Sequence, residues 1–165
     1  MINISKGLDL PISGKPDLNI ADTPNVSSVS LLSNDFIGMK PTMLVREGDE
    51  VKVGTKLFED KKNEGIFFTS PAGGEIKSIN RGDKRKFLSV EIEINQNEQF
   101  IEYEFEDSID STKNNLISSG LWNAFRTRPF NRTPAINDKP NAIFINCCDT
   151  NPLSADPLNL SLIHI

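Results

Sequence analysis

The chain has 165 residues, of which 37% are hydrophobic and 25% are charged, and its formal net charge is −5. This length fits one domain, or one domain and part of a second, with the composition of an ordinary globular protein. The acidic balance argues against nucleic acid as a partner. No apolar run approaches the roughly 18 residues of a spanning helix, so we expect no transmembrane segment.

Residues 1–100 predict a β-rich domain. Short apolar segments separated by Gly and Pro are typical of a small barrel or sandwich. The expected strands cover residues 43–45, 66–68 and 90–94. The last of these alternates strictly and places Val90, Ile92 and Ile94 on one face.

The centre of this region resembles the barrel-sandwich hybrid fold of biotinyl and lipoyl domains. Gly48 and Gly54 are suited to the positive φ of tight turns, with apolar residues set between them. Pro71 and the Gly73–Gly74 pair are expected to turn the chain back beneath the opposite sheet. The predicted core residues are Val45, Val51, Leu57 and Ile76.

An acidic linker, residues 101–112, is expected to precede a second, α/β domain over residues 113–159. A helix is predicted over residues 110–126, capped by Asp110 or Ser111 and ended by Pro129. Its apolar face is expected to carry Leu116, Ile117, Leu121 and Phe125. Residues 142–145 predict a buried strand, followed by a polar loop, as in the first part of an α/β unit.

The chain offers no catalytic constellation. Its single histidine, His164, lies in the last residues, so a Ser/His/Asp or Cys/His arrangement is excluded. Cys147 and Cys148 are adjacent, which favours two small buried residues over a disulfide framework or a metal site. No Gly-rich phosphate loop occurs either.

Several motifs in order resemble the A subunit of the bacterial Na+-translocating NADH:quinone oxidoreductase. The most specific is GLWNAFRTRPF at residues 120–130, which contains the only Trp. The others are GMKPTM at 38–43, LFEDKKN at 57–63, FTSPA at 68–72 and DTNPL at 149–153. The pattern breaks at residues 160–165. We therefore expect a non-native tail there, and a chain that is an N-terminal fragment.

The resemblance implies a peripheral subunit on the cytoplasmic face of the bacterial inner membrane, in a complex that oxidises NADH, reduces ubiquinone and exports Na+. It implies NADH and flavin sites on the other subunits and no cofactor bound covalently or metal held by this chain. This subunit would contribute to the quinone-reducing end and to assembly. The isolated chain is expected to be inactive.

The residues expected to border the quinone belong to two segments far apart in the sequence. They are Phe36, Gly38, Met39 and Pro41, with Arg128, Pro129, Phe130 and Pro134. Trp122, Phe125 and Phe130 suit either core packing or an aromatic surface for a quinone ring, and core packing is preferred. Arg126, Arg128 and Arg132 suit either a bound anion or ion pairs with the acidic segment 102–110.

Two other functions belong to different classes of protein. The C subunit of an Rnf-type electron-transport complex would carry a glycine loop where this chain has residues 119–125, and cysteine clusters further on. A lipoyl- or biotin-like carrier would present a modified lysine near Lys61 and Lys62. The surrounding charged run, residues 59–63, favours a solvated hairpin without modification.

Overall fold

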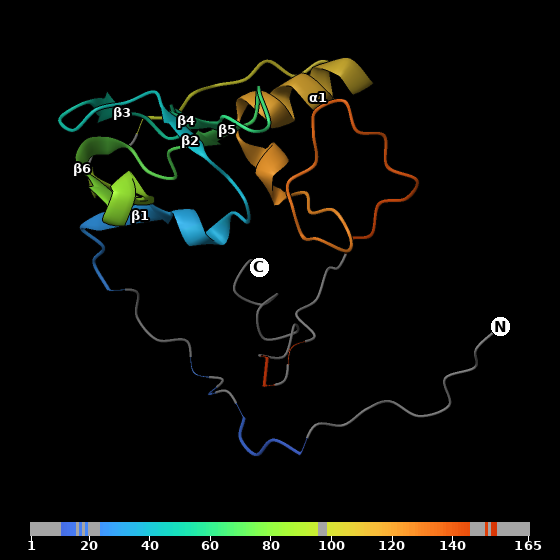
Figure 1. Cartoon of the computed structure of the whole chain (residues 1–165), viewed down its shortest axis with the longest axis horizontal. Helices are drawn as coiled ribbons and strands as arrows, with labels where there is room; N and C mark the ends of the chain where they lie inside the picture. The colour runs from blue at the N-terminus through green and yellow to red at the C-terminus, as the bar shows by residue number, and fades with distance from the viewer. Residues whose placement is uncertain are drawn as a thin grey trace. The chain divides into compact units, whose positions relative to one another are not determined.

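The computed structural model describes residues 11–15, 17, 19, 24–95, 99–145, 151, 153 and 154. The chain divides into two units, one comprising Asn25–Lys139 and the other Met1–Pro24 with Pro140–Ile165. The first unit holds every helix and strand labelled in Figure 1. His164, both cysteines and the predicted tail, residues 160–165, lie outside the described residues.

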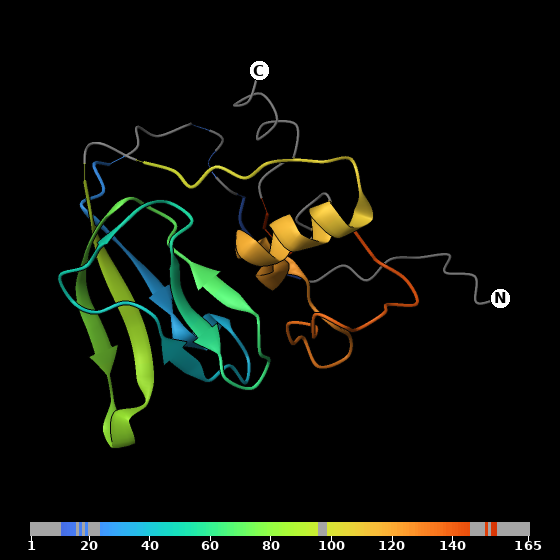
Figure 2. The ribbon, with the colours of Figure 1, turned by 90° about the horizontal axis from the view of Figure 1, so that it is seen from above.

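Two antiparallel sheets form the β-rich part of the first unit. The larger has the strand order β1-β7-β6-β3 and the smaller the order β2-β4-β5. The strands are β1 (Ser28–Leu32), β2 (Pro41–Met43), β3 (Glu50–Val51), β4 (Lys56–Asp60), β5 (Phe67–Thr69), β6 (Gly74–Arg81) and β7 (Phe87–Ile94), with short 3₁₀ helices η1 (Ser33–Asp35) and η2 (Asp83–Arg85). The long β6–β7 hairpin projects beyond the other strands, with η2 at its tip (Figure 2).

One apolar core joins the two sheets. Leu57 and Phe58 of β4 are fully buried, as are Val90 and Ile92 of β7. The Phe58 ring stacks on Phe68 with centroids 4.7 Å apart, within the range of favourable aromatic pairs. The four residues predicted for the core are all buried: Val45, Val51, Leu57 and Ile76. The β-rich fold predicted for this region is thereby confirmed.

The glycine turns are also as the sequence predicts. Gly48 has φ +90° and Gly54 has φ +91°, values that L-residues with a side chain rarely adopt. The strand bounds differ by one to three residues from those expected, the largest difference being at β7, which begins at Phe87. Residues 44 and 45 follow β2 without belonging to it, and β5 begins at Phe67.

The predicted helix is shorter than expected and is capped by a different residue. Helix α1 (Ile109–Ser118) begins after Ser108, whose Oγ accepts a hydrogen bond from the Ser111 amide at 3.1 Å. It ends before Gly120, which takes φ +79° and leads into η3 (Leu121–Ala124). The predicted caps and the ending at Pro129 are therefore wrong, because Ser108 and Gly120 satisfy the two helix ends first.

The helix end is attached to the edge of the smaller sheet. The Thr69 hydroxyl donates to the Ser119 carbonyl at 2.8 Å, and the Asn123 side-chain amide donates to the Phe67 carbonyl at 2.6 Å. Both strand residues belong to β5, the outermost strand of its sheet. The turn between α1 and η3 thus covers an edge that would otherwise expose unpaired backbone groups.

The strand predicted at residues 142–145 is absent. These residues have no regular secondary structure, and Phe144 is 92% exposed. An apolar run becomes a buried strand only where a neighbouring strand pairs with it, and the described residues of this unit include no strand. No helix in the described part of the chain is long and apolar enough to cross a membrane.

Candidate functional site

A depression beside the β4–β5 turn brings together segments that are far apart in the sequence. Its volume is about 310 Å³. We call it the β4–β5 depression. Its lining residues come from the loop after β1, from the β4–β5 turn and strand β5, and from the loop after η3: Phe36, Ile37, Gly38, Met39, Asp60, Lys62, Asn63, Phe68, Arg132, Thr133 and Ala135.

The loop after η3 is held by hydrogen bonds from Asn63 of the β4–β5 turn and from Trp122 and Arg126 of the preceding segment. The Asn63 amide donates to the Pro134 carbonyl at 3.3 Å, and the Trp122 indole N–H donates to the same oxygen at 3.0 Å. Arg126 Nη1 donates to the Asn123 carbonyl at 2.7 Å and to the Thr133 hydroxyl at 2.9 Å. The hydrogen bonds from Asn63 and Trp122 hold residue 134 by its main-chain carbonyl oxygen, so the proline ring takes no part in them.

The apolar side of the depression rests on the core. The Phe36 ring meets Phe68 edge to face, with centroids 4.5 Å apart. The Arg126 guanidinium lies 5.7 Å from the Phe36 centroid, within the range of a cation–π contact. Phe36 is therefore fixed between the core and a cation, with part of its ring left to line the depression.

The polar side is built by the turn that follows β4. The Asp60 carboxylate accepts the backbone amides of Lys40 and Lys62, each at 3.0 Å. The Lys62 ammonium donates to the Gly38 carbonyl at 3.0 Å. Asp60 is thus occupied by backbone donors, and Arg132 forms no ion pair within the described residues. The depression combines an aromatic wall with cationic donors, which suits a flat ligand carrying carbonyl oxygens.

The predicted site residues lie in three places. Phe36, Gly38 and Met39 line the depression, and Pro134 supplies the carbonyl that anchors it. Pro41 lies in β2, where it pairs with Asp60. Arg128, Pro129 and Phe130 form an adjacent exposed turn that does not line the depression, and Phe130 is 70% exposed.

The charged run at residues 59–63 contributes to the depression in a way that its composition does not predict. The charges indicate only a solvated hairpin, yet Asp60, Lys62 and Asn63 line the depression. An Asx turn could have been predicted from the sequence, because an Asp side chain often accepts a hydrogen bond from the backbone amide two residues later, as Asp60 does from Lys62. Core packing is correct for Trp122, which packs against the core cluster, but wrong for the exposed Phe130.

The arginines of residues 126–132 do not pair with the acidic segment 102–110. Among the described residues, which include both segments, the one ion pair joins Lys77 and Glu91 at 2.9 Å. The hydrogen bond between these two side chains raises the pKa of Lys77 and lowers the pKa of Glu91. Burial raises the pKa of Tyr103. None of these three side chains lines the β4–β5 depression.

We expect Lys61 and Lys62 to carry no lipoyl or biotinyl group. The Lys62 ammonium donates to the Gly38 carbonyl, so this side chain is not free. The turn that carries Lys61 is also attached to a neighbouring segment, because the Lys61 backbone amide donates to the Lys40 carbonyl at 2.8 Å. A swinging lysine instead needs a free side chain at a projecting tip. The intact mass of the protein from its native host should equal that of the unmodified polypeptide. An increment of either cofactor would restore the carrier hypothesis.

Comparison with known proteins places both parts of the chain. A family model described as the NqrA N-terminal barrel-sandwich hybrid domain matches residues 2–95. Another, described as the NqrA second alpha/beta domain, matches residues 108–162. The predicted fold class, a barrel-sandwich hybrid domain followed by the start of an α/β domain, is confirmed by these matches.

Individual relatives agree with the family models. Proteins named as the A subunit of Na(+)-translocating NADH-quinone reductase, from Yersinia pseudotuberculosis and Actinobacillus pleuropneumoniae, are each 52% identical over 163 residues. The protein of that name from Glaesserella parasuis is 51% identical. Each alignment covers 95% of this chain and 36% of the relative. The chain therefore spans just over a third of the length of the curated relatives it matches.

Proposed function

Because the chain belongs to the family of the A subunit of Na(+)-translocating NADH-quinone reductase, we propose that it serves in a membrane redox pump that oxidises NADH, reduces ubiquinone and exports Na+. It acts there as a peripheral subunit on the cytoplasmic face of the bacterial inner membrane. NADH and the flavins bind to other subunits. This chain contributes to assembly and to the quinone-reducing end.

The domain organisation proposed from the sequence accompanies this function. A barrel-sandwich domain over residues 1–100 carries most of the β4–β5 depression, and residues 101–112 form the linker to the α/β domain at 113–159. The support for this organisation is that one family model matches residues 2–95 and the other matches residues 108–162. The depression is lined from both sides of this boundary, by Phe36 and Asp60 and by Arg132 and Thr133. A quinone bound in the depression would contact both domains, so its binding would depend on how the two domains are placed relative to each other.

The observation that carries the quinone proposal is the aromatic wall next to two cations. The half-exposed ring of Phe36 offers a face to a quinone head group, and offset aromatic contacts contribute about 0.5–1.5 kcal/mol each. Lys62 and Arg132 offer donors to quinone oxygens. The exposed ring of Phe130, whose centroid is 6.0 Å from the Arg132 guanidinium carbon, adds a second aromatic surface beside the depression.

The test is steady-state kinetics of the assembled complex containing the full-length subunit. Phe36→Leu keeps an apolar side chain but removes the ring, and Phe130→Ala removes the second ring. Each change is expected to raise KM for a soluble ubiquinone analogue about fivefold with little change in kcat, as expected for lost ground-state binding. Phe105→Ala, at a side chain 72% exposed in the linker, is the matched control.

Unchanged KM in both variants, with normal assembly of the complex, would contradict quinone access at this depression. The same assay addresses the isolated chain, which is expected to show no NADH oxidation above the background without enzyme. Turnover by the isolated chain would show that it carries redox chemistry of its own.

A further inference from the structure

The tip of the β6–β7 hairpin concentrates positive charge on a chain whose net charge is −5. Between residues 81 and 86 there are four cations and one acid, and all five side chains are exposed. The cations are Arg81, Lys84, Arg85 and Lys86. Within the described part of the chain none of them forms an ion pair, since the one pair present joins Lys77 and Glu91. Their positive charge is therefore exposed to solvent and is not neutralised by a neighbouring carboxylate.

The backbone of this tip is held in a strained conformation. Lys84 has φ +54° and Arg85 has φ +61°, both in the left-handed region. The turn is closed by the Gly82 amide, which donates to the Lys86 carbonyl at 2.7 Å. Gly or Asn would adopt these angles at lower cost. Two consecutive cations at such positions indicate that their charge has a use beyond stabilising the hairpin.

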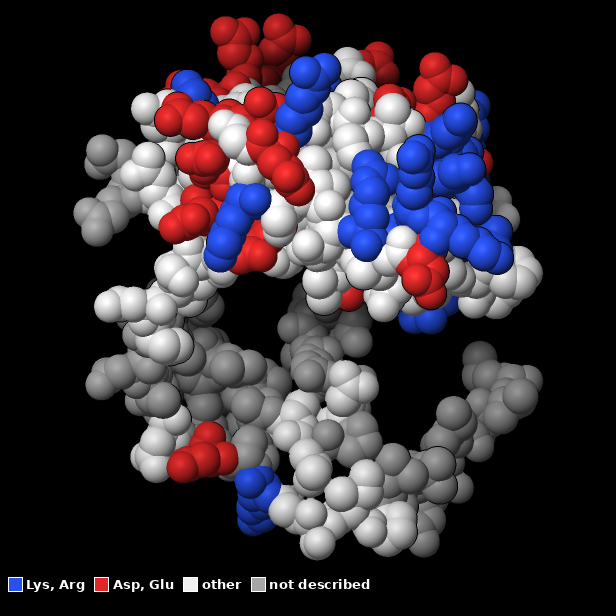
Figure 3. Space-filling view, turned by 60° about the vertical axis from the view of Figure 1, so that its left-hand side comes forward, with Lys and Arg blue, Asp and Glu red and all other residues white. Residues whose placement is uncertain are grey.

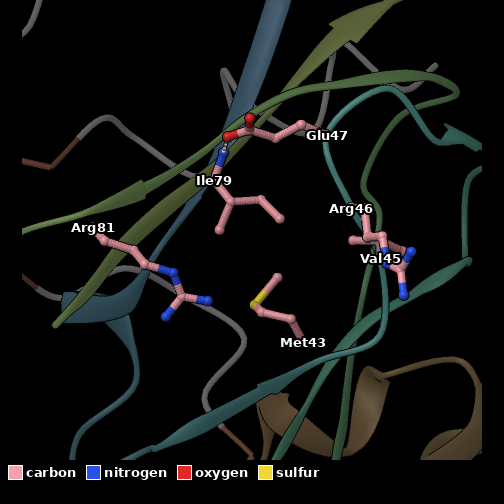
Figure 4. Close-up of a pocket in the computed structure, with 6 residues that line it drawn as sticks. All are labelled: Met43, Val45, Arg46, Glu47, Ile79 and Arg81. Carbon is pink, nitrogen blue, oxygen red and sulfur yellow. Dashed lines mark hydrogen bonds between the residues drawn. The ribbon is translucent and has the colours of Figure 1, made fainter. Parts of the chain in front are cut away.

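A second depression lies beside the hairpin, close to its tip. Its volume is about 570 Å³, and its lining residues are Met43, Val45, Arg46, Glu47, Ile79 and Arg81. Figure 4 shows Arg81 and Arg46 on opposite sides of it, with the side chains of Met43 and Ile79 between them. The Glu47 carboxylate is occupied, because it accepts the Ile79 amide at 2.7 Å. Two arginines thus flank an apolar floor.

Charges of the two signs are separated along the larger sheet. Glu50, Glu75 and Glu93 are cross-strand neighbours at the end of the sheet opposite the hairpin tip. Strand β6 leads from Glu75 to Arg81, a span of roughly 20 Å. In the face that Figure 3 shows, a cluster of Lys and Arg lies on one side and most of the Asp and Glu lie on the other, with a few charges of the opposite sign on each side. An anionic surface would therefore meet this unit in one orientation, with the hairpin tip toward it.

We propose that the hairpin tip and its adjoining depression form a docking surface for an anionic phospholipid bilayer. A projecting tip fits a flat surface better than it fits the concave site of a protein partner. The Leu88 side chain, 43% exposed, lies against Gly82 and adds an apolar group beside the cations. Phosphate groups suit Arg46 and Arg81, while Lys84 and Lys86 need no fixed partner geometry.

This inference rests on the proposed function for the presence of a membrane near the chain, but its test needs neither quinone nor NADH. The 165-residue chain is mixed with vesicles and separated by flotation in a density gradient, which leaves aggregated protein at the bottom. The vesicles contain phosphatidylcholine alone or phosphatidylcholine with about a third phosphatidylglycerol, a fraction that gives a negative surface potential. Failure of this test leaves the kinetic test of the depression at Phe36 unaffected.

The chain is expected to float with the anionic vesicles and to remain behind with the neutral ones. The triple change Lys84→Gln, Arg85→Gln and Lys86→Gln should weaken binding about 100-fold, at roughly fivefold for each cation near an anionic surface. The control Lys52→Gln, Lys61→Gln and Lys139→Gln removes the same charge from exposed positions elsewhere and should bind almost as the unchanged chain does. Raising the salt concentration should release the unchanged chain.

Three results would overturn the proposal. The first is equal weakening by the two triple changes when both proteins melt at the temperature of the unchanged chain. The second is equal binding to neutral and anionic vesicles. The third is no flotation together with hairpin-dependent capture on immobilised polyglutamate, which would assign the cations to an acidic protein partner.

Discussion

Replacing Leu57 by Ala should lower the free energy of unfolding by about 2–5 kcal/mol. Leu57 is fully buried in β4, next to Phe58, and both residues belong to the core cluster. The change removes apolar contacts and leaves a cavity that close packing around Phe58 and Phe68 keeps from collapsing. The measurement is urea denaturation of the chain followed by far-UV circular dichroism.

Leu121→Ala is the matched control for this experiment. It deletes the same atoms from a side chain that is 61% exposed, so a loss under about 0.5 kcal/mol is expected. If Leu57→Ala were equally mild, Leu57 would have to lie at the surface. The joint core of the two sheets would then be incorrect.

Gly74→Ala should destabilise the β domain by about 3 kcal/mol, the upper end of the range for overpacking. A Cβ on Gly74 would overlap the main-chain carbonyl oxygen of Glu93 on the neighbouring strand. Backbone cannot swing aside as a flexible side chain does. Strands β6 and β7 would have to separate where Gly74 pairs with Ile94, losing hydrogen bonds at that end of the hairpin.

The control for this change lies at the other end of the same hairpin. Gly82 has φ −96°, and a Cβ there would meet only the Leu88 side chain, at 3.4 Å. Gly82→Ala is therefore expected to alter stability by no more than about 1 kcal/mol, because the stiffer unfolded chain offsets the close contact. A similar loss in both variants, measured by thermal melting, would show that the approach of Glu93 to Gly74 is not the cause.

The features that the sequence predicts correctly depend on local chemistry. Gly48 and Gly54 predict turns because few other residues adopt a positive φ. Val90 and Ile92 predict a one-sided strand because side chains alternate along it. Leu57 is predicted to be buried by its place between such turns. Each of these inferences needs only a few neighbouring residues.

The features that the sequence does not predict depend on competition or on distant contacts. Ser108, Asp110 and Ser111 all favour a helix N-cap, and only the folded chain selects Ser108. The β4–β5 depression requires Asn63 to reach Pro134, which is 71 residues away. Residues 142–145 have the apolar composition of a buried strand, but a strand also needs a neighbouring strand with which to form backbone hydrogen bonds. No short window of sequence contains that information.

The hydrogen bonds from the helix end to β5 bear on where the chain tolerates a cut. A polypeptide ending near residue 100 would retain both sheets but lose Ser119 and Asn123, the partners of Thr69 and Phe67. The outer side of β5 would then be an open template for strand addition by a second molecule. Such a shortened barrel would self-associate through the unpaired backbone N–H and C=O groups at this one sheet edge, while its apolar core stayed intact.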